Sequence, residues 1–97
     1  MDKMFFIRKQ YEFDSLHRVV EELNRYIDER IRQEEEAADA LSDNPDDPGW
    51  KDKKIFYLES VHAFHSIEKH LLRLLIEKQK EMDRLMKAYK HQMKVEG

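Results

Sequence analysis

The side chains in this sequence most able to do chemistry are its five histidines and the acids placed near them. Glu59 and His62 are three positions apart, so on a helix they would be neighbours and could bind one metal ion. A single carboxylate from another helix, such as Glu29, would add a further ligand. His17 and Glu21 form a weaker candidate, because a histidine and an acid one helical turn apart are a common surface pair.

The Glu-x-x-His spacing of Glu59 and His62 resembles the motif of ferritin-like di-iron bundles, in which such pairs join single glutamates from other helices. The resemblance covers four positions and implies a half-bundle that completes its metal site by dimerising. On a helical wheel, however, both residues point away from the apolar face, whereas ligands in these bundles point inward. We therefore predict no metal and no other cofactor, and keep a metal-binding half-bundle using Glu29, Glu59 and His62 as an alternative.

His65 and Glu68 differ from that pair because both fall within the apolar face of the same predicted helix. We interpret them as a buried polar layer that fixes helix register or oligomeric state, as buried polar residues do in coiled coils. Tyr26, with Asn24 or Arg25, is the predicted partner on the facing helix. Because the sequence offers no glycine-rich loop and no nucleophile beside a base, we expect no catalytic residue and no enzymatic activity.

The longest periodic stretch runs from Asp47 to Met93 and has no proline or glycine after Gly49. Its apolar residues recur at three- and four-residue steps, which is the period of one continuous α-helix. Asp47 is expected to cap this helix and Pro48 to occupy its first position. We predict a long helix over residues 48–93.

A shorter helix is predicted over residues 14–41, where the apolar residues again form one stripe. Residues 4–13 also fit a strand, but a lone strand would have no sheet to join, so the helix is expected to start near residue 4. The acidic run from Glu34 to Glu36 is interpreted as a solvated helix face. Residues 42–47 are rich in turn formers and predict the loop.

These elements predict an all-α fold, with residues 1–97 forming one domain that is an antiparallel helical hairpin with a long second helix. If the loop is centred on residue 45 or 46, Leu23 would face Glu68 and Leu16 would face Leu75. The sequence has no cysteine, so a disulfide framework and a thiol nucleophile are excluded. Its apolar run near the N-terminus is too short for a membrane span, and we expect a cytoplasmic protein.

Charge is distributed unevenly along the chain, although the net charge is only −3. Residues 28–47 carry a net charge of −7, and residues 69–94 carry +5. The bases of the second segment are interleaved with Glu77, Glu81 and Asp83, which argues against a dedicated nucleic-acid surface. Weak nucleic-acid binding through this basic helix remains a further alternative.

The apolar face of the second helix is about 200° wide, and one partner helix covers about half of that. We therefore predict an antiparallel homodimer that forms a four-helix bundle with coiled-coil packing, since antiparallel chains bring unlike charged ends together. The expected function is that of a small non-enzymatic protein-binding regulator, adaptor or accessory subunit. A larger protein complex is a second kind of partner that we consider beside the homodimer. The predicted interface residues are Leu58, Val61, Phe64, His65, Glu68, Leu71, Leu72, Leu75, Met82, Met86 and Tyr89.

Overall fold

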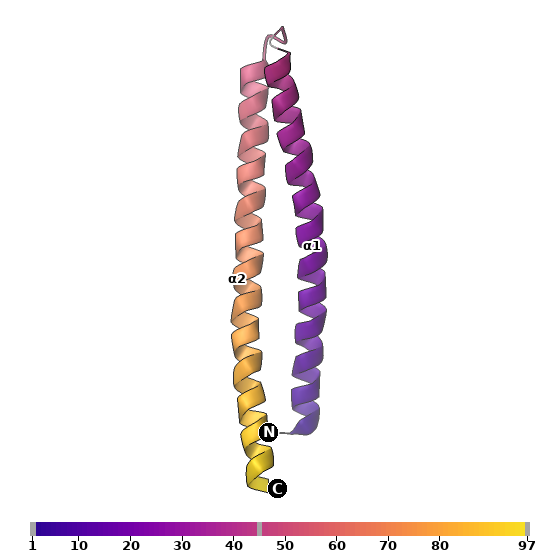
Figure 1. The fold of residues 1–97 in the computed structure, drawn as a ribbon, viewed down its shortest axis with the longest axis vertical. Helices are drawn as coiled ribbons and strands as arrows, with labels where there is room; N and C mark the ends of the chain where they lie inside the picture. Colours follow the sequence, from indigo (N-terminus) through magenta and orange to yellow (C-terminus); the bar gives the residue numbers. More distant parts are fainter. Residues whose placement is uncertain (1, 45, 97) are drawn as a thin grey trace. The chain divides into compact units, whose positions relative to one another are not determined.

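The computed structural model describes residues 2–44 and 46–96, and these residues form two helices and no strand. Helix α1 spans Lys3–Asp43 and helix α2 spans Trp50–Glu96, as labelled in Figure 1. The all-α prediction is therefore confirmed. Helix α1 begins near the earlier of the two predicted starts, because Asp2 accepts a hydrogen bond from the Met4 amide at 3.1 Å and so caps it. In the part of the chain described here, neither helix contains an apolar stretch that could cross a membrane.

The contacts divide the chain into two compact units. Unit 2, residues 22–70, holds the second half of α1, the loop and the first part of α2. Its two helices run antiparallel: Lys54 donates a hydrogen bond to Ser42 near the loop, and Asp28 meets Glu68 farther along. Ile27, Ile31, Ala38 and Val61 are the buried apolar residues of this unit. The predicted register is therefore wrong by about five residues, since Glu68 lies opposite Asp28 and not Leu23.

Unit 1 consists of residues 1–21 and 71–97, of which 2–21 and 71–96 are described. Here the start of α1 packs on the last part of α2. The rings of Phe6 and Tyr89 stack with centroids 4.7 Å apart, and Phe6 and Val20 are the buried apolar side chains of the unit. Phe13, Leu16 and Met82 line a small hollow between the two helices, rimmed by the ion pairs Lys9–Glu12 and Lys78–Glu81.

We expect Phe6→Ala to lower the free energy of unfolding by about 3 kcal/mol, because it removes a buried aromatic ring and the stacking of that ring on Tyr89. Phe5→Ala is the matched control, since Phe5 is 42% exposed and Phe6 only 7%. Urea unfolding followed by circular dichroism measures both variants. Equal losses of stability for the two would contradict the described packing of unit 1.

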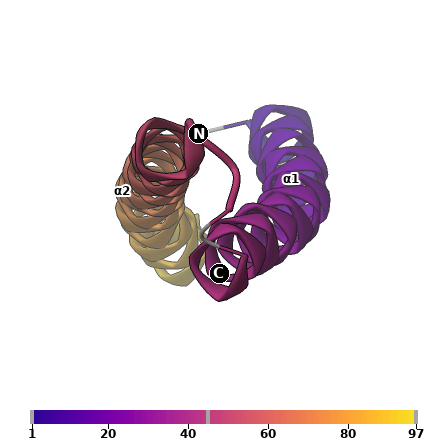
Figure 2. The same ribbon diagram turned by 90° about the horizontal axis from the view of Figure 1, so that it is seen from above.

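The loop joins the end of α1 to the start of α2 and is seen end-on in Figure 2. Pro45 lies outside the described residues. Asp47 organises the second half of the loop: its Oδ1 accepts a hydrogen bond from the Gly49 amide at 3.1 Å, and its backbone oxygen accepts one from Trp50 at 3.1 Å. Because Pro48 and Gly49 are used in this turn, α2 begins at Trp50, two residues later than predicted.

Lys53 reaches back from the first turn of α2 to Asp47, with 2.8 Å between Nζ and Oδ2. This hydrogen bond, followed by the one from Gly49, lowers the pKa of the Asp47 carboxyl. A lowered pKa means that the ionised carboxylate stabilises the folded state above the ordinary value of 3.8, and that this contribution is lost as the pH falls through the folded-state pKa.

We expect Asp47→Ala to destabilise the protein at neutral pH, because it removes the carboxylate that accepts hydrogen bonds from Gly49 and Lys53. Asp46→Ala, at an exposed neighbouring position, should change stability much less. Thermal unfolding at several pH values measures both. The difference between wild type and Asp47→Ala should shrink in acid, and a difference that is constant with pH would show that the carboxylate is not responsible.

Buried and half-buried residues recur at steps of three and four along both helices, as in a coiled-coil seam. In α1 this seam contains Phe6, Phe13, Leu16, Val20, Asn24, Ile27, Ile31, Glu34, Ala38 and Leu41. In α2 it contains Lys54, Tyr57, Val61, Phe64, Glu68, Leu71, Leu75, Met82, Met86 and Tyr89. Each helix therefore buries one narrow stripe, and most residues beside that stripe are exposed, although Arg30, Ala37 and Ser60 are half-buried.

Candidate interaction surface

The residues predicted to form an interface lie at three levels of exposure. Val61 is buried, and Phe64, Glu68, Leu71, Leu75, Met82, Met86 and Tyr89 are half-buried. Leu58, His65 and Leu72 are exposed. The covered residues belong to the seam of their own unit, so the exposed ones are those most available to another molecule.

The predicted polar layer is only partly buried. The side chain of Glu68 is 22% exposed and that of His65 is 54% exposed, and their Nδ1 and Oε1 atoms are 3.3 Å apart. Tyr26 is 63% exposed and does not cover this pair. The residue that meets Glu68 from α1 is Asp28. The prediction that Tyr26 satisfies the layer is wrong, because Asp28 takes that place and the Tyr26 side chain lies in water.

The carboxyl groups of Asp28 and Glu68 are therefore in contact at the seam of unit 2. The hydrogen bond with Asp28 raises the pKa of Glu68, and partial burial and the negative charge of Asp28 raise it further, while His65 acts in the opposite direction. A raised pKa means that the folded state binds this proton more tightly than the unfolded chain does. The resulting stabilisation is complete below the ordinary value of 4.5 and is lost as the pH rises through the folded-state pKa.

We expect Glu68→Gln to remove this pH-dependent loss of stability, because a neutral amide keeps a hydrogen-bonding group beside Asp28 without the second charge. At neutral pH the variant should be at least as stable as the wild type. Glu59→Gln, at an exposed position of the same helix, is the control and should leave the pH profile unchanged. Urea unfolding from acid to neutral pH measures the profiles. If the stability of wild type and of Glu68→Gln changed with pH in the same way, the hydrogen bond between the Asp28 and Glu68 carboxyl groups would be contradicted.

Glu34 is a buried acid that the sequence analysis placed in a solvated run. It is 9% exposed, whereas Glu35 and Glu36 are exposed as expected. Arg30 donates a hydrogen bond to its Oε1 at 3.1 Å, while its Oε2 is buried without a hydrogen-bond partner, as is Oδ1 of Asn24. The seven-residue step from Ile27 to Glu34, which continues the seam, was the sequence signal that this acid is covered.

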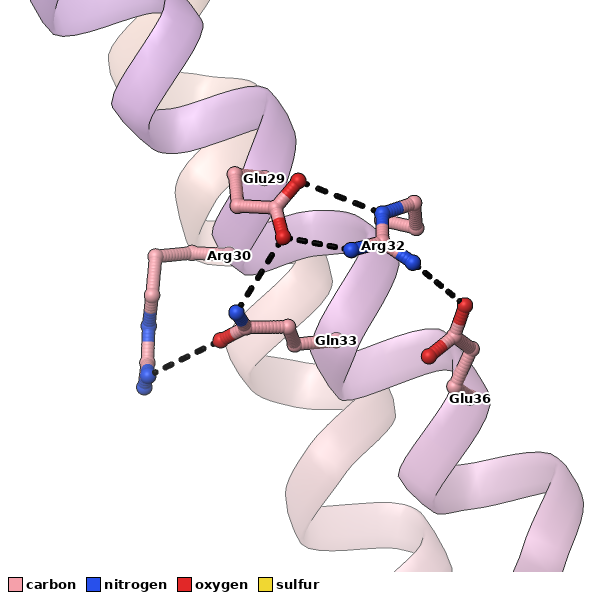
Figure 3. A network of polar contacts seen from close by, with 5 residues as sticks. All are labelled: Glu29, Arg30, Arg32, Gln33 and Glu36. Carbon is pink, nitrogen blue, oxygen red and sulfur yellow. Dashed lines mark hydrogen bonds and ion pairs between the residues drawn. The ribbon is translucent and has the colours of Figure 1, made fainter.

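The outer surface of α1 carries a ladder of polar contacts (Figure 3). Arg32 donates to Glu29 and, at 2.7 Å, to Glu36, and Gln33 donates to Glu29 at 3.3 Å. The hydrogen bond from Arg32 lowers the pKa of Glu29. Such exposed pairs contribute little stability, but this one already engages the carboxylate that the metal-binding alternative requires.

The other two residues of the metal-binding alternative, Glu59 and His62, are both exposed on α2. Among the described residues, no group of three or more His, Asp or Glu side chains is placed to hold a metal ion. In the basic segment, Lys78 pairs with Glu81 at 3.3 Å and Gln79 donates to Asp83 at 3.0 Å. Glu81 and Asp83 thus contact polar side chains of the same helix.

Unit 2 has two flanks, one on each side of its seam. We call one the alanine flank; its residues are Leu23, Tyr26, Arg30, Gln33, Ala37 and Ala40 from α1 and Phe56, Ser60, Ala63 and Ile67 from α2. We call the other the histidine flank; its residues include Arg25, Asp28, Arg32, Glu35, Leu58, His62, His65 and Lys69. Helical periodicity assigns both sets. At the loop end of the alanine flank, Ala37 and Ala40 line a hollow together with Leu41, Asn44, Asp47, Lys53 and Tyr57.

The alanine flank exposes large apolar side chains. Tyr26 is 63% exposed, Phe56 65%, Ile67 45% and Leu23 43%. Phe56 and Ile67 lie beside the seam of α2 and widen its apolar face. Comparison of the chain with protein-family models, with curated proteins and with solved structures finds no match. The function is therefore argued from this surface.

Proposed function

We propose that this protein is a small non-enzymatic interaction module that acts as a homodimer, with two hairpins forming a four-helix bundle. The observation that carries the proposal is the imbalance between exposed and buried apolar residues. Among the described residues, sixteen large apolar side chains are more than a third exposed, whereas six hydrophobic residues are buried. Exposed apolar surface of this extent favours association with another protein.

The accessible surface area of the chain gives the area that a dimer would bury. The chain exposes 7672 Å². A folded monomer of 11.9 kDa exposes about 6,000 Å², so the excess is about 1,700 Å² per chain. Two copies that covered this excess would bury about 3,400 Å², which lies within the 2,000–5,000 Å² range typical of obligate homodimers.

In this proposal the dimer presents its charged ends and remaining apolar side chains to further proteins, as an adaptor, regulator or accessory subunit does. Met93, near the end of α2, suits such contacts, because methionine adapts to surfaces of different shape. Met93 is 56% exposed and Val95 73%. The cytoplasmic location expected from the sequence remains a prediction.

We expect sedimentation equilibrium at micromolar concentration to give about twice the chain mass of 11.9 kDa. Because burial of apolar side chains supplies most of the association, each contributing roughly 1.5–3 kcal/mol, raising the salt concentration should weaken the dimer only modestly. A monomer with a cooperative unfolding transition would refute the proposal. A dimer that dissociates completely in moderate salt would show that charge, not apolar burial, holds it together.

A further inference from the structure

We propose that the second copy docks on the alanine flank of unit 2 in an antiparallel, two-fold symmetric arrangement centred between Arg30 and Gln33. The inference rests on the proposed homodimer and assigns its interface, which the sequence analysis placed mainly on the seam residues and on Leu58 and Leu72. It differs from that assignment because the seam residues are covered within the chain, and because the two flanks of unit 2 differ in charge.

The two flanks of unit 2 differ in the number of charged residues that a docked copy would bury. Along α1 the histidine flank carries Arg25, Asp28, Arg32 and Glu35. On the alanine flank, Arg30 is the one ionised residue in the stripe from Leu23 to Ala40, and the stripe from Phe56 to Ile67 has none, all of these residues being described. An ion taken out of water without a partner is strongly destabilising, so a second copy is accommodated far more easily on the alanine flank.

The α1 side chains of the alanine flank differ in size from one end of the stripe to the other, so two antiparallel copies are complementary. The stripe has two large residues at one end, Leu23 and Tyr26, and two small ones at the other, Ala37 and Ala40. The alanines line a hollow beside the loop. When a second α1 runs antiparallel across this stripe, Tyr26 of each copy lies opposite Ala37 of the other, and Leu23 lies opposite Ala40. Large side chains thus enter the spaces over small ones at both ends of the interface.

The same two-fold axis also pairs residues of α2. In unit 2 Asp28 is level with Glu68 and Ser42 with Lys54, so the midpoint between Arg30 and Gln33 is level with the step from Phe64 to His65. On the alanine flank of α2, Ala63 and Ile67 lie on either side of that level, and the midpoint between them is about half a residue from it. The axis therefore places Ala63 of one copy opposite Ile67 of the other, again a small residue against a large one.

The centre of the flank is polar and is satisfied within each chain. Arg30 donates to Gln33 at 3.4 Å and to Glu34 at 3.1 Å. In the dimer Arg30 of each copy faces Gln33 of the other, so the guanidinium keeps its carboxylate and can exchange the amide acceptor of its own chain for that of the other copy. A polar group surrounded by apolar contacts fixes one register, because sliding by a turn would set Arg30 against Ala37.

Charge sets the direction of the second copy. Residues 28–47 carry a net charge of −7, and they include the loop end of unit 2. A parallel arrangement would bring the two acidic loop ends together, whereas the antiparallel arrangement separates them.

Ile67→Asp and Leu58→Asp provide a matched test, since Ile67 is 45% exposed and Leu58 46% on the same helix, one on each flank. We expect Ile67→Asp to weaken the dimer by about a hundredfold or more, because both copies lose apolar burial and would bury a charge, and Leu58→Asp to leave it nearly unchanged. Sedimentation equilibrium measures both variants, and circular dichroism verifies that each keeps its helices. Dissociation by Leu58→Asp with retention by Ile67→Asp would overturn the assignment.

Cross-linking tests the register directly, because the chain contains no native cysteine. The double variant Tyr26→Cys/Ala37→Cys should form covalent dimers on mild oxidation, while either single variant should not. The two sites lie about 16 Å apart on one helix, too far for a disulfide within the chain. Tyr26→Cys/Ala40→Cys is the control with the register shifted.

The outcomes separate the two proposals. Covalent dimers in the Tyr26→Cys/Ala37→Cys variant alone support the docking arrangement. A wild-type dimer without that cross-link, or with a stronger one in the shifted control, overturns the arrangement but leaves the homodimer intact. A wild-type monomer refutes the homodimer itself, and the alanine flank would then not bind a second copy.

Discussion

A pair of helices can bury only one narrow stripe on each member, and this constraint accounts for most features of the chain. Val20, Ile27, Ile31 and Ala38 fall on the stripe of α1 and are buried. Leu23 and Tyr26 lie within one turn of them and remain exposed. The difference is one of angular position and not of hydrophobicity, since Leu23 is as apolar as the residues that are covered. What one helix cannot cover must face water or another molecule.

The seam also contains polar groups, and their arrangement concerns specificity more than stability. Glu34 is buried with one oxygen unpaired, and Glu68 shares its place with Asp28. Both arrangements cost free energy that an apolar residue of similar size would not. Such groups are retained in coiled coils where they disfavour other registers. In this hairpin they lie on either side of the level at which we centre the proposed dimer, since Glu68 is level with Asp28 and Glu34 lies six residues farther along α1.

Exposed charges organise the surface of α1 without stabilising it greatly. The contacts of Arg32 with Glu29 and Glu36 are exposed ion pairs, which contribute little to stability. Their consequence is that one surface of unit 2 is occupied by solvated ion pairs while the alanine flank stays nearly free of charge. This contrast, and not the amount of apolar surface alone, makes one flank the better candidate for a protein contact.

The sequence by itself determined the helical fold, the position of the loop and the excess of apolar residues over what one helix pair can bury. These follow from local periodicity, from the scarcity of glycine and proline, and from the turn-forming residues around Asp47, all of which act within a few residues of each other. Only the tertiary structure decided the register, because a slide of about five residues between the helices keeps nearly the same apolar residues in the seam and changes their partners. That shift replaced Leu23 by Asp28 opposite Glu68. Periodicity says which residues share a face, whereas the loop and the packing of side chains across the seam decide what each face meets.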